Sequence, residues 1–380
     1  MKICLVAFYS PYGDNPLARL SDLLHIFEPL AEEIFLITAD VPNGANLNKK
    51  ARLMNITYSS NSRLMPAKLL RQLAAQLTIS WHLLKISRQV DLIFWGISAH
   101  SLIIPMLLAR LMRKKTILFL ASESSKVLTN MFGVKGFILS QIHRVIEDAS
   151  YSLCHTIVVN STELLNQPRL VKHRDKSFPL ACPIRFMNIN IFKISKPLKQ
   201  RPKRIGFVGR LSAEKGVRNL VMAMPLVLDR CRDLELTLIG DGPQNNELRG
   251  TVKENGLSDK VKLTDWVAHA ELPAHLNEMQ LLVLPSFTEG LPTIALEAMA
   301  CGTPVLATPV GGVPELISDD ETGFIMEDNS PECIARNIIR ALDYPGLDKL
   351  IENAQALVEK EFTYDQTVER YRQVLNSLGM

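Results

Sequence analysis

Short hydrophobic runs of strand length recur along the whole chain and alternate with longer stretches in which apolar residues follow helical spacing. Two of these stretches, Pro66–Arg88 and Lys215–Arg230, are long enough for crossover helices. Strand, helix and strand repeated in this way predict parallel sheets covered by helices on both faces. The predicted strands are Ile3–Phe8, Ile34–Thr38, Leu92–Trp95, Ile117–Leu120 and Thr156–Val159, then Arg204–Val208, Leu234–Ile239, Val261–Thr264, Leu281–Leu284 and Pro304–Ala307.

The segment Lys193–Arg204 interrupts this pattern. It is basic, holds two prolines and lacks apolar periodicity, and the hydrophobic pattern restarts at Ile205. We interpret it as an interdomain linker. The chain is therefore predicted to be an α/β protein with two Rossmann-like, doubly wound domains that face each other across a cleft. The predicted domains are residues 1–196 and 197–362, with a C-terminal helix at 363–380 that packs back on the first domain.

Composition fits a globular protein whose halves differ in charge. The chain has 380 residues, 47% hydrophobic and 22% charged, which excludes a disordered or fibrous protein. Residues 1–200 carry 25 Lys and Arg against 12 Asp and Glu, a net of +13, whereas residues 201–380 carry 18 against 27, a net of −9. The basic half predicts an anionic membrane surface or a phosphorylated acceptor as partner, with solvated surface lysines as the alternative. No nucleic-acid partner is predicted.

The cysteines and the N-terminus restrict cofactors and location. The cysteines form no CxxC pair, and neither they nor the histidines show the spacing of a zinc site, which argues against a zinc site and against a disulfide scaffold. No metal is therefore predicted. The N-terminal run lacks the features of a signal peptide, and no uninterrupted apolar run reaches about 18 residues. We therefore expect a cytoplasmic protein without a membrane span. The cysteines are Cys4, Cys154, Cys182, Cys231, Cys301 and Cys333.

The first candidate for chemistry is the segment Gly206–Gly216, which reads as a strand, a glycine-bearing turn and a helix start. Gly209 permits close approach of the backbone, and Arg210 and Lys215 supply positive charge beside a helix N-terminus. These are the ingredients of a diphosphate site. The alternative is an ordinary strand-to-helix turn with surface cations.

The second candidate is the segment 286–304, which runs from the Leu281–Leu284 strand through a loop into a helix that begins at Thr293 and ends at Gly302. Glu289 falls in the loop and Glu297 one turn inside the helix. Free amides around Gly290, Leu291 and Thr293 are suited to phosphate or sugar oxygens. A carboxylate such as Glu297 accepts two hydrogen bonds from a ribose diol. The alternative for Glu297 is an exposed helix glutamate. The alternative for Glu289 is a charge near the helix N-terminus that favours the helix dipole.

Together with two further motifs, these segments resemble a known family. Gly-Asp-Gly-Pro stands at 240–243 and Gly-Gly-Val-Pro-Glu at 311–315, and Glu289 and Glu297 lie eight residues apart. In this order and spacing, over most of residues 204–330, the chain resembles the retaining family-four glycosyltransferases of GT-B fold.

The resemblance implies a role for each matching residue. Arg210 and Lys215 match the pair that clamps the donor diphosphate, and Glu297 matches the glutamate that binds the donor ribose. Glu289 matches the glutamate beside the transferred sugar. The amides of 290–293 match the loop around the phosphates and sugar, and the Trp266–Val267 stretch matches the backbone contact to the base.

The implied reaction moves a sugar from a nucleoside-diphosphate sugar to an acceptor hydroxyl with retention of configuration. The acceptor is expected to be a saccharide or a lipid-linked molecule, in polysaccharide, glycolipid or other glycoconjugate synthesis. No cofactor and no metal are expected, and the chain holds no Asp-x-Asp motif.

The N-terminal half departs from the family. Ser122 or Glu123 stands where many members have a histidine close to the reacting sugar, and Gly13 alone remains of a glycine-rich loop. With Val267, these residues are candidates for the cleft. A non-catalytic nucleotide-sugar-binding protein and a sugar-nucleotide epimerase on the same fold therefore stay open as alternatives.

A basic amphipathic stretch at Met65–Lys85, with Arg113–Lys115, suggests contact with an anionic membrane. The alternative is a crossover helix whose apolar face lies in the core. The expected location is the cytoplasm, with peripheral attachment to the cytoplasmic face of the membrane left open.

Overall fold

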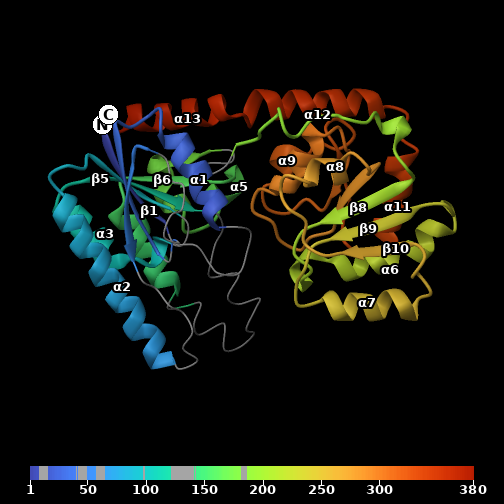
Figure 1. Ribbon diagram of the computed structural model, residues 1–380, viewed down its shortest axis with the longest axis horizontal. Coiled ribbons are helices and arrows are strands. Elements are labelled where there is room, and N and C mark those ends of the chain that lie inside the picture. Colours follow the sequence, from blue (N-terminus) through green and yellow to red (C-terminus); the bar gives the residue numbers. More distant parts are fainter. Residues whose placement is uncertain are drawn as a thin grey trace. The chain divides into compact units, whose positions relative to one another are not determined.

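The computed structural model describes residues 1–7, 16–39, 41, 49–56, 65–96, 99–120, 141, 143–180 and 186–380. It divides the chain into two compact units (Figure 1). Unit 1 comprises Met1–Phe186 with Asp365–Met380, and unit 2 comprises Met187–Tyr364.

Unit 1 is built on a parallel sheet with strand order β3-β2-β1-β4-β5-β6-β7. Its central strands are buried along most of their length, as expected for strands covered on both faces. The strands are β1 Lys2–Ala7, β2 Glu33–Ala39, β3 Ala51–Ile56, β4 Leu92–Trp95, β5 Lys115–Leu120, β6 Thr156–Val159 and β7 Ser177–Pro179.

The helices of unit 1 cover the sheet with two apolar cores. One core includes Ile79 and Leu83 of α2, and the other includes Phe27 of α1 and Tyr371 of α13. The Tyr371 ring lies 4.9 Å from that of Phe27, so the C-terminal helix is an integral part of this unit. The helical segments are α1 Pro16–Phe27, α2 Met65–Ile86, η1 Ala99–Ser101, α3 Ile103–Leu111, residues 143–153, α5 Thr162–Leu165, η2 Val171–Lys176 and α13 Tyr364–Ser377.

Unit 2 repeats the same topology, with strand order β10-β9-β8-β11-β12-β13 in another parallel sheet. In each unit the first strand lies inside the sheet and the order reverses beside it, which is the Rossmann-like, doubly wound arrangement. The strands are β8 Arg204–Val208, β9 Glu235–Ile239, β10 Val261–Thr264, β11 Leu281–Leu284, β12 Val305–Ala307 and β13 Phe324–Ile325.

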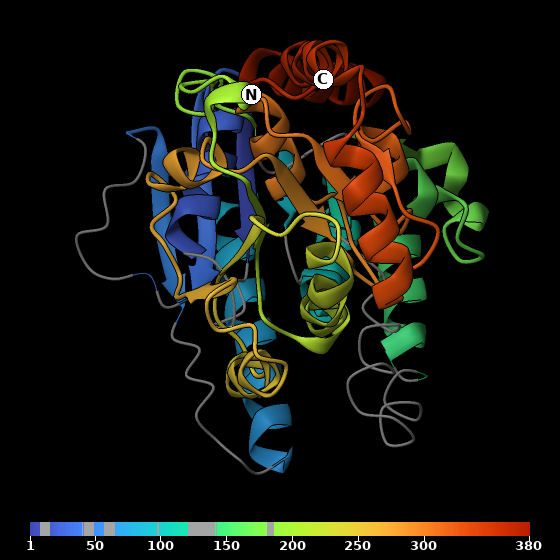
Figure 2. The ribbon, with the colours of Figure 1, turned by 90° about the vertical axis from the view of Figure 1, so that its right-hand side faces the viewer.

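The helices of unit 2 include α6 and α11, which pack against each other (Figure 1 and Figure 2). Among the described residues of the whole chain, no helix is both long and apolar enough to cross a bilayer. The helical segments of unit 2 are η3 Leu198–Gln200, η4 Ala213–Lys215, α6 Val217–Leu228, α7 Asn245–Glu254, α8 Leu272–Leu276, α9 Thr293–Ala300, α10 Val313–Leu316, α11 Pro331–Leu342 and α12 Leu347–Glu361.

The predicted α/β fold class with parallel sheets is confirmed, and β4, β6, β8, β10 and β11 have the predicted bounds. Three strands were missing from the prediction. In β3, side chains such as Arg52 and Asn55 interrupt the apolar pattern, because this strand lies at the sheet edge. The other two, β7 and β13, are too short to leave a hydrophobic run.

The predicted linker belongs to unit 2, and the chain divides after Phe186 rather than at residue 196. Ser195 and Lys196 donate their backbone amides to Oδ1 of Asn277. The side chain of Arg201 is buried and donates to the carbonyls of Met279 and Cys301 at 2.9 and 2.7 Å. Proline and positive charge in sequence suggested a solvated linker, but these contacts fix the segment against unit 2.

Candidate functional site

The predicted site residues of unit 2 follow the carboxyl ends of three strands of its sheet. Residues 209–216 follow β8, residues 265–271 follow β10, and residues 285–292 follow β11. Because β8, β10 and β11 belong to one parallel sheet, their carboxyl ends meet at one edge. This edge is where ligands bind in doubly wound sheets.

Two glycines allow the loops at this edge to touch. Gly216 has φ +65°, and a Cβ atom there would lie 2.0 Å from the carbonyl oxygen of Pro285. Gly311 has φ +59°, and its Cβ would lie 1.9 Å from the carbonyl oxygen of Glu289. Any side chain would push these loops apart. The motif glycines thus bring the loops after β8, β11 and β12 into direct contact.

The structure joins Lys215 to Glu289. Lys215 Nζ lies 2.7 Å from Glu289 Oε1, and Ser286 Oγ donates to the same oxygen at 2.7 Å. The side chains are 25% and 10% exposed respectively, so both are largely shielded from solvent. Two residues selected from separate motifs therefore form one charged pair, next to the start of α9.

The loop into α9 has the predicted form. The helix begins at Thr293 and ends before Gly302, which has φ +65°. Within the part of the chain that the structure describes, the amides of Gly290 and Leu291 have no hydrogen-bond acceptor. Such amides before a helix N-terminus can donate to an anion or a sugar oxygen.

Glu297 lies inside α9, as predicted, and its side chain is 7% exposed. Its Oε1 lies 2.8 Å from Nε2 of His269, and the His269 ring lies 5.1 Å from the ring of Phe192. His269 was missed in the sequence, because no metal-ligand spacing distinguished it from the other histidines. His269 follows β10 by a few residues and stands close to Val267 in sequence. This position after a strand of the sheet is the signal that could have identified it.

The structure describes only some of the remaining candidates. Arg210 is exposed, and among the described residues it forms no ion pair. Val267 is half-buried beside the exposed ring of Trp266. Gly209 donates its amide to the carbonyl of Ile239 at 3.0 Å. Gly13, Ser122 and Glu123 lie outside the described residues.

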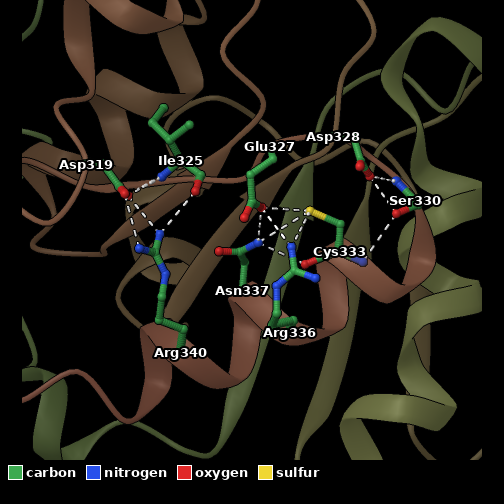
Figure 3. Close-up of polar contacts among 9 residues, drawn as sticks. All are labelled: Asp319, Ile325, Glu327, Asp328, Ser330, Cys333, Arg336, Asn337 and Arg340. Atoms are coloured by element: carbon green, nitrogen blue, oxygen red, sulfur yellow. Dashed lines mark hydrogen bonds and ion pairs between the residues drawn. The ribbon is translucent and has the colours of Figure 1, made fainter.

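A second polar cluster in unit 2 holds α11 to the segment after β13 (Figure 3). Glu327 Oε2 accepts from Cys333 Sγ at 3.0 Å, Asn337 Nδ2 at 2.9 Å and Arg336 Nη2 at 3.0 Å. These donors lower the pKa of Glu327 to about 2, the Cys333 hydrogen bond contributing most. None of the predicted site residues belongs to this cluster, and its hydrogen bonds indicate a structural role.

We also searched for side chains that could bind a metal ion. Within the part of the chain that the structure describes, no group of three or more His, Cys, Asp or Glu side chains is arranged to hold one.

Comparisons with known proteins agree with this architecture. Residues 188–358 match the family of glycosyl transferases group 1. The 2-deoxystreptamine glucosyltransferase of Streptomyces kanamyceticus is 37% identical over 142 residues, which is 37% of each chain. The putative colanic acid biosynthesis glycosyltransferase WcaL of Escherichia coli is 26% identical over 63% of this chain and 67% of its own. The chain thus spans little more than a third of the first relative and two thirds of the second.

A solved structure extends the likeness to both units. HepE of Anabaena, solved in complex with UDP and glucose, has a TM-score of 0.74 at 19% identity and covers 99% of this chain and 100% of its own. At this identity the likeness shows the fold, which is that of GT-B glycosyltransferases. Residues 188–358 of this chain therefore match the glycosyl transferases group 1, within a chain that has the fold of GT-B glycosyltransferases.

Proposed function

We propose that the protein is a retaining glycosyltransferase that moves a sugar from a nucleoside-diphosphate sugar to an acceptor hydroxyl. The observation that carries this proposal is the pairing of Lys215 with Glu289 in the segment that matches the family. The pair sets a cation and a carboxylate 2.7 Å apart, beside the unpaired amides of Gly290 and Leu291. A sugar diphosphate needs this combination of groups, because during transfer the diphosphate gains negative charge and the anomeric carbon gains positive charge.

In the proposed mechanism, the cations stabilise the leaving group. The departing diphosphate gains negative charge in the transition state, so Lys215 and Arg210 bind it more strongly then than in the ground state. Because Arg210 has no ion pair among the described residues, it can turn to the phosphates without breaking one. These side-chain cations supply the charge that a metal ion supplies elsewhere, and the proposal includes no metal and no cofactor.

Retention is proposed to follow from attack on one face of the sugar. The bond from the anomeric carbon to the diphosphate oxygen breaks, and the acceptor oxygen bonds to the same face of that carbon. The acceptor proton passes to the departing phosphate oxygen. Glu289 stabilises the positive charge that develops at the anomeric carbon meanwhile.

Glu297 is proposed to bind the donor ribose. Its Oε1 is held by His269, which leaves Oε2 for the 2′ and 3′ hydroxyls. His269 is then a positioning residue, because it orients the carboxylate and does not itself contact the donor.

The relatives suggest which donor and which acceptor to test first. HepE was solved with UDP and glucose, so a UDP-hexose is the first donor to test. WcaL carries a name from polysaccharide synthesis, which favours a saccharide or a lipid-linked acceptor in glycoconjugate synthesis. We propose a cytoplasmic location, with an anionic membrane surface as a further partner of unit 1.

A thermal-shift screen with UDP-, GDP- and ADP-sugars tests the proposal, because a bound donor raises the melting temperature by mass action. One class of nucleotide sugar should stabilise the protein, and Lys215→Ala should abolish most of that shift. Lys253→Ala, an exposed lysine of α7, is the matched control. If no nucleotide sugar raises the melting temperature, donor binding is wrong. Stabilisation without transfer to any acceptor, or with epimerised donor as product, supports one of the two alternatives instead.

A further inference from the structure

Helix α2, Met65–Ile86, has apolar residues on two opposite sides. Ala75, Ile79, Leu83 and Ile86 are buried in the core of unit 1. Steps of three and four residues place a second set on the other side of the helix. This outer stripe consists of Leu70, Leu73, Leu77, Trp81 and Leu84, which are 68, 45, 55, 57 and 50% exposed.

The outer stripe exceeds what a crossover helix needs. Packing on the sheet requires one apolar face, and α2 already supplies it through Ile79 and Leu83. Large apolar side chains gathered in one row on a surface mark a site of interaction. The core interpretation of this helix is thus confirmed, and it leaves the outer stripe without a role.

Helix α3, Ile103–Leu111, packs against α2 and adds exposed leucines (Figure 1). The amide of Ile104 donates to Oε1 of Gln76 at 3.0 Å, which ties the start of α3 to the middle of α2. Leu107 and Leu111 are 47 and 73% exposed. Both helices of this pair therefore present apolar side chains to solvent.

Basic residues accompany these leucines. Residues 65–115 contain eight Lys and Arg, with Asp91 as the sole acidic residue of that stretch of sequence. Lys85, Arg88, Arg110 and Arg113 are exposed. Lys85 Nζ lies 4.9 Å from the centroid of the Trp81 ring. A tryptophan beside a lysine combines an apolar ring with a cation that reaches for headgroups, which suits the interface of a bilayer.

We propose that the outer stripe of α2 docks on an anionic lipid bilayer. The helix lies in the interface plane, with Leu77 and Trp81 among the acyl chains and the basic residues against anionic headgroups. A second copy of the chain fits this surface less well, because the pairing would bring two basic surfaces together. The inference deepens the proposed function by placing unit 1 at a lipid-linked acceptor, but docking itself requires no donor.

Sedimentation with vesicles tests the inference on the full chain. Vesicles of phosphatidylcholine with phosphatidylglycerol should bind the protein, and vesicles of phosphatidylcholine alone should not. Binding should fall as salt rises, because exposed charges are screened within about 10 Å at 0.1 M salt. The pair Leu77→Gln and Trp81→Gln should lower the partition coefficient about tenfold or more, since it removes two inserted side chains. Leu226→Gln, an exposed leucine of α6 that is 42% exposed, is the matched control.

Tryptophan quenching by brominated lipids identifies the inserted residue. Trp81 and Trp266 are 57 and 52% exposed, whereas Trp95 is buried. Trp81→Phe should lose the quenching while it still sediments with vesicles, and Trp266→Phe should keep it. Equal quenching in both variants, or unchanged sedimentation of the Leu77 and Trp81 variant, would overturn the inference. So would a protein that stays in the supernatant but forms a dimer that these substitutions dissociate.

The same samples distinguish this inference from the proposed function. The melting-temperature rise with a nucleotide sugar should be unchanged in the Leu77 and Trp81 variant, because these residues belong to unit 1 and the candidate donor site to unit 2. Vesicle binding without any nucleotide effect would reject the transferase and keep the docking surface. A nucleotide effect without vesicle binding would do the reverse.

Discussion

Glu289→Gln is expected to strengthen the binding of free UDP, although it removes a residue of the proposed catalytic site. Lys215 Nζ donates to Glu289 Oε1 at 2.7 Å. The diphosphate must share or take over this cation, and its negative charge is repelled by the carboxylate. Glutamine keeps the shape and still accepts from Ser286, but it removes the competing charge.

The magnitude follows from the environment of the pair. With side chains 25 and 10% exposed, the pair is screened less than a surface ion pair, which contributes about 0.2–1 kcal/mol. We expect the upper half of that range, roughly 0.5–1 kcal/mol, or about a two- to fivefold lower Kd for UDP. Lys215→Ala should weaken the binding free energy of UDP by roughly 1.5–3 kcal/mol, since it removes a charge-assisted contact.

Titration calorimetry with UDP on folded variants measures both effects. Glu321→Gln, an exposed residue of unit 2, changes the net charge equally and should leave the Kd unchanged. In the Lys215→Ala background the gain from Glu289→Gln should shrink, because no cation remains to be released. Turnover of Glu289→Gln should fall despite tighter binding of UDP. Unchanged or weaker UDP binding in Glu289→Gln would refute the competition between carboxylate and diphosphate.

Three further expectations concern unit 2. Arg201→Met should lower the free energy of unfolding by roughly 2–4 kcal/mol in chemical denaturation, because buried carbonyls lose their donor. The control is Arg232→Met at an exposed position. Equal denaturation midpoints of the two variants would contradict the expectation. Glu297→Gln should narrow the affinity gap between UDP and its 2′-deoxy analogue; an unchanged gap would remove Glu297 from the ribose. Glu327 has its pKa lowered from 4.5 to about 2, so its contribution to stability is present above pH 4.5 and is lost as pH falls towards 2. The stability difference between wild type and Glu327→Gln should therefore shrink below pH 4.5, and a constant difference would argue against this ionisation.

The sequence alone determined most of the strands and the motif residues of unit 2. Parallel strands buried on both faces leave continuous apolar runs, which is why β8, β10 and β11 have their predicted bounds. Glycines mark the turns where loops touch, so the segments with Lys215 and Glu289 were identified without a structure. The candidates of the N-terminal half, such as Gly13 and Ser122, remain predictions, since they lie outside the described residues.

The tertiary structure decided which side chains meet. Lys215 and Glu289 are 74 residues apart, and His269 and Glu297 are 28 apart, so only the packing of loops at the sheet edge makes them partners. The same holds for Arg201, whose charge suggested a solvated linker. Its acceptors include the carbonyls of Met279 and Cys301, about 80 and 100 positions later. Periodicity shows that α2 is apolar, but only its neighbours decide which apolar side is buried. Pattern is local along the chain, whereas burial and pairing depend on contacts between distant segments.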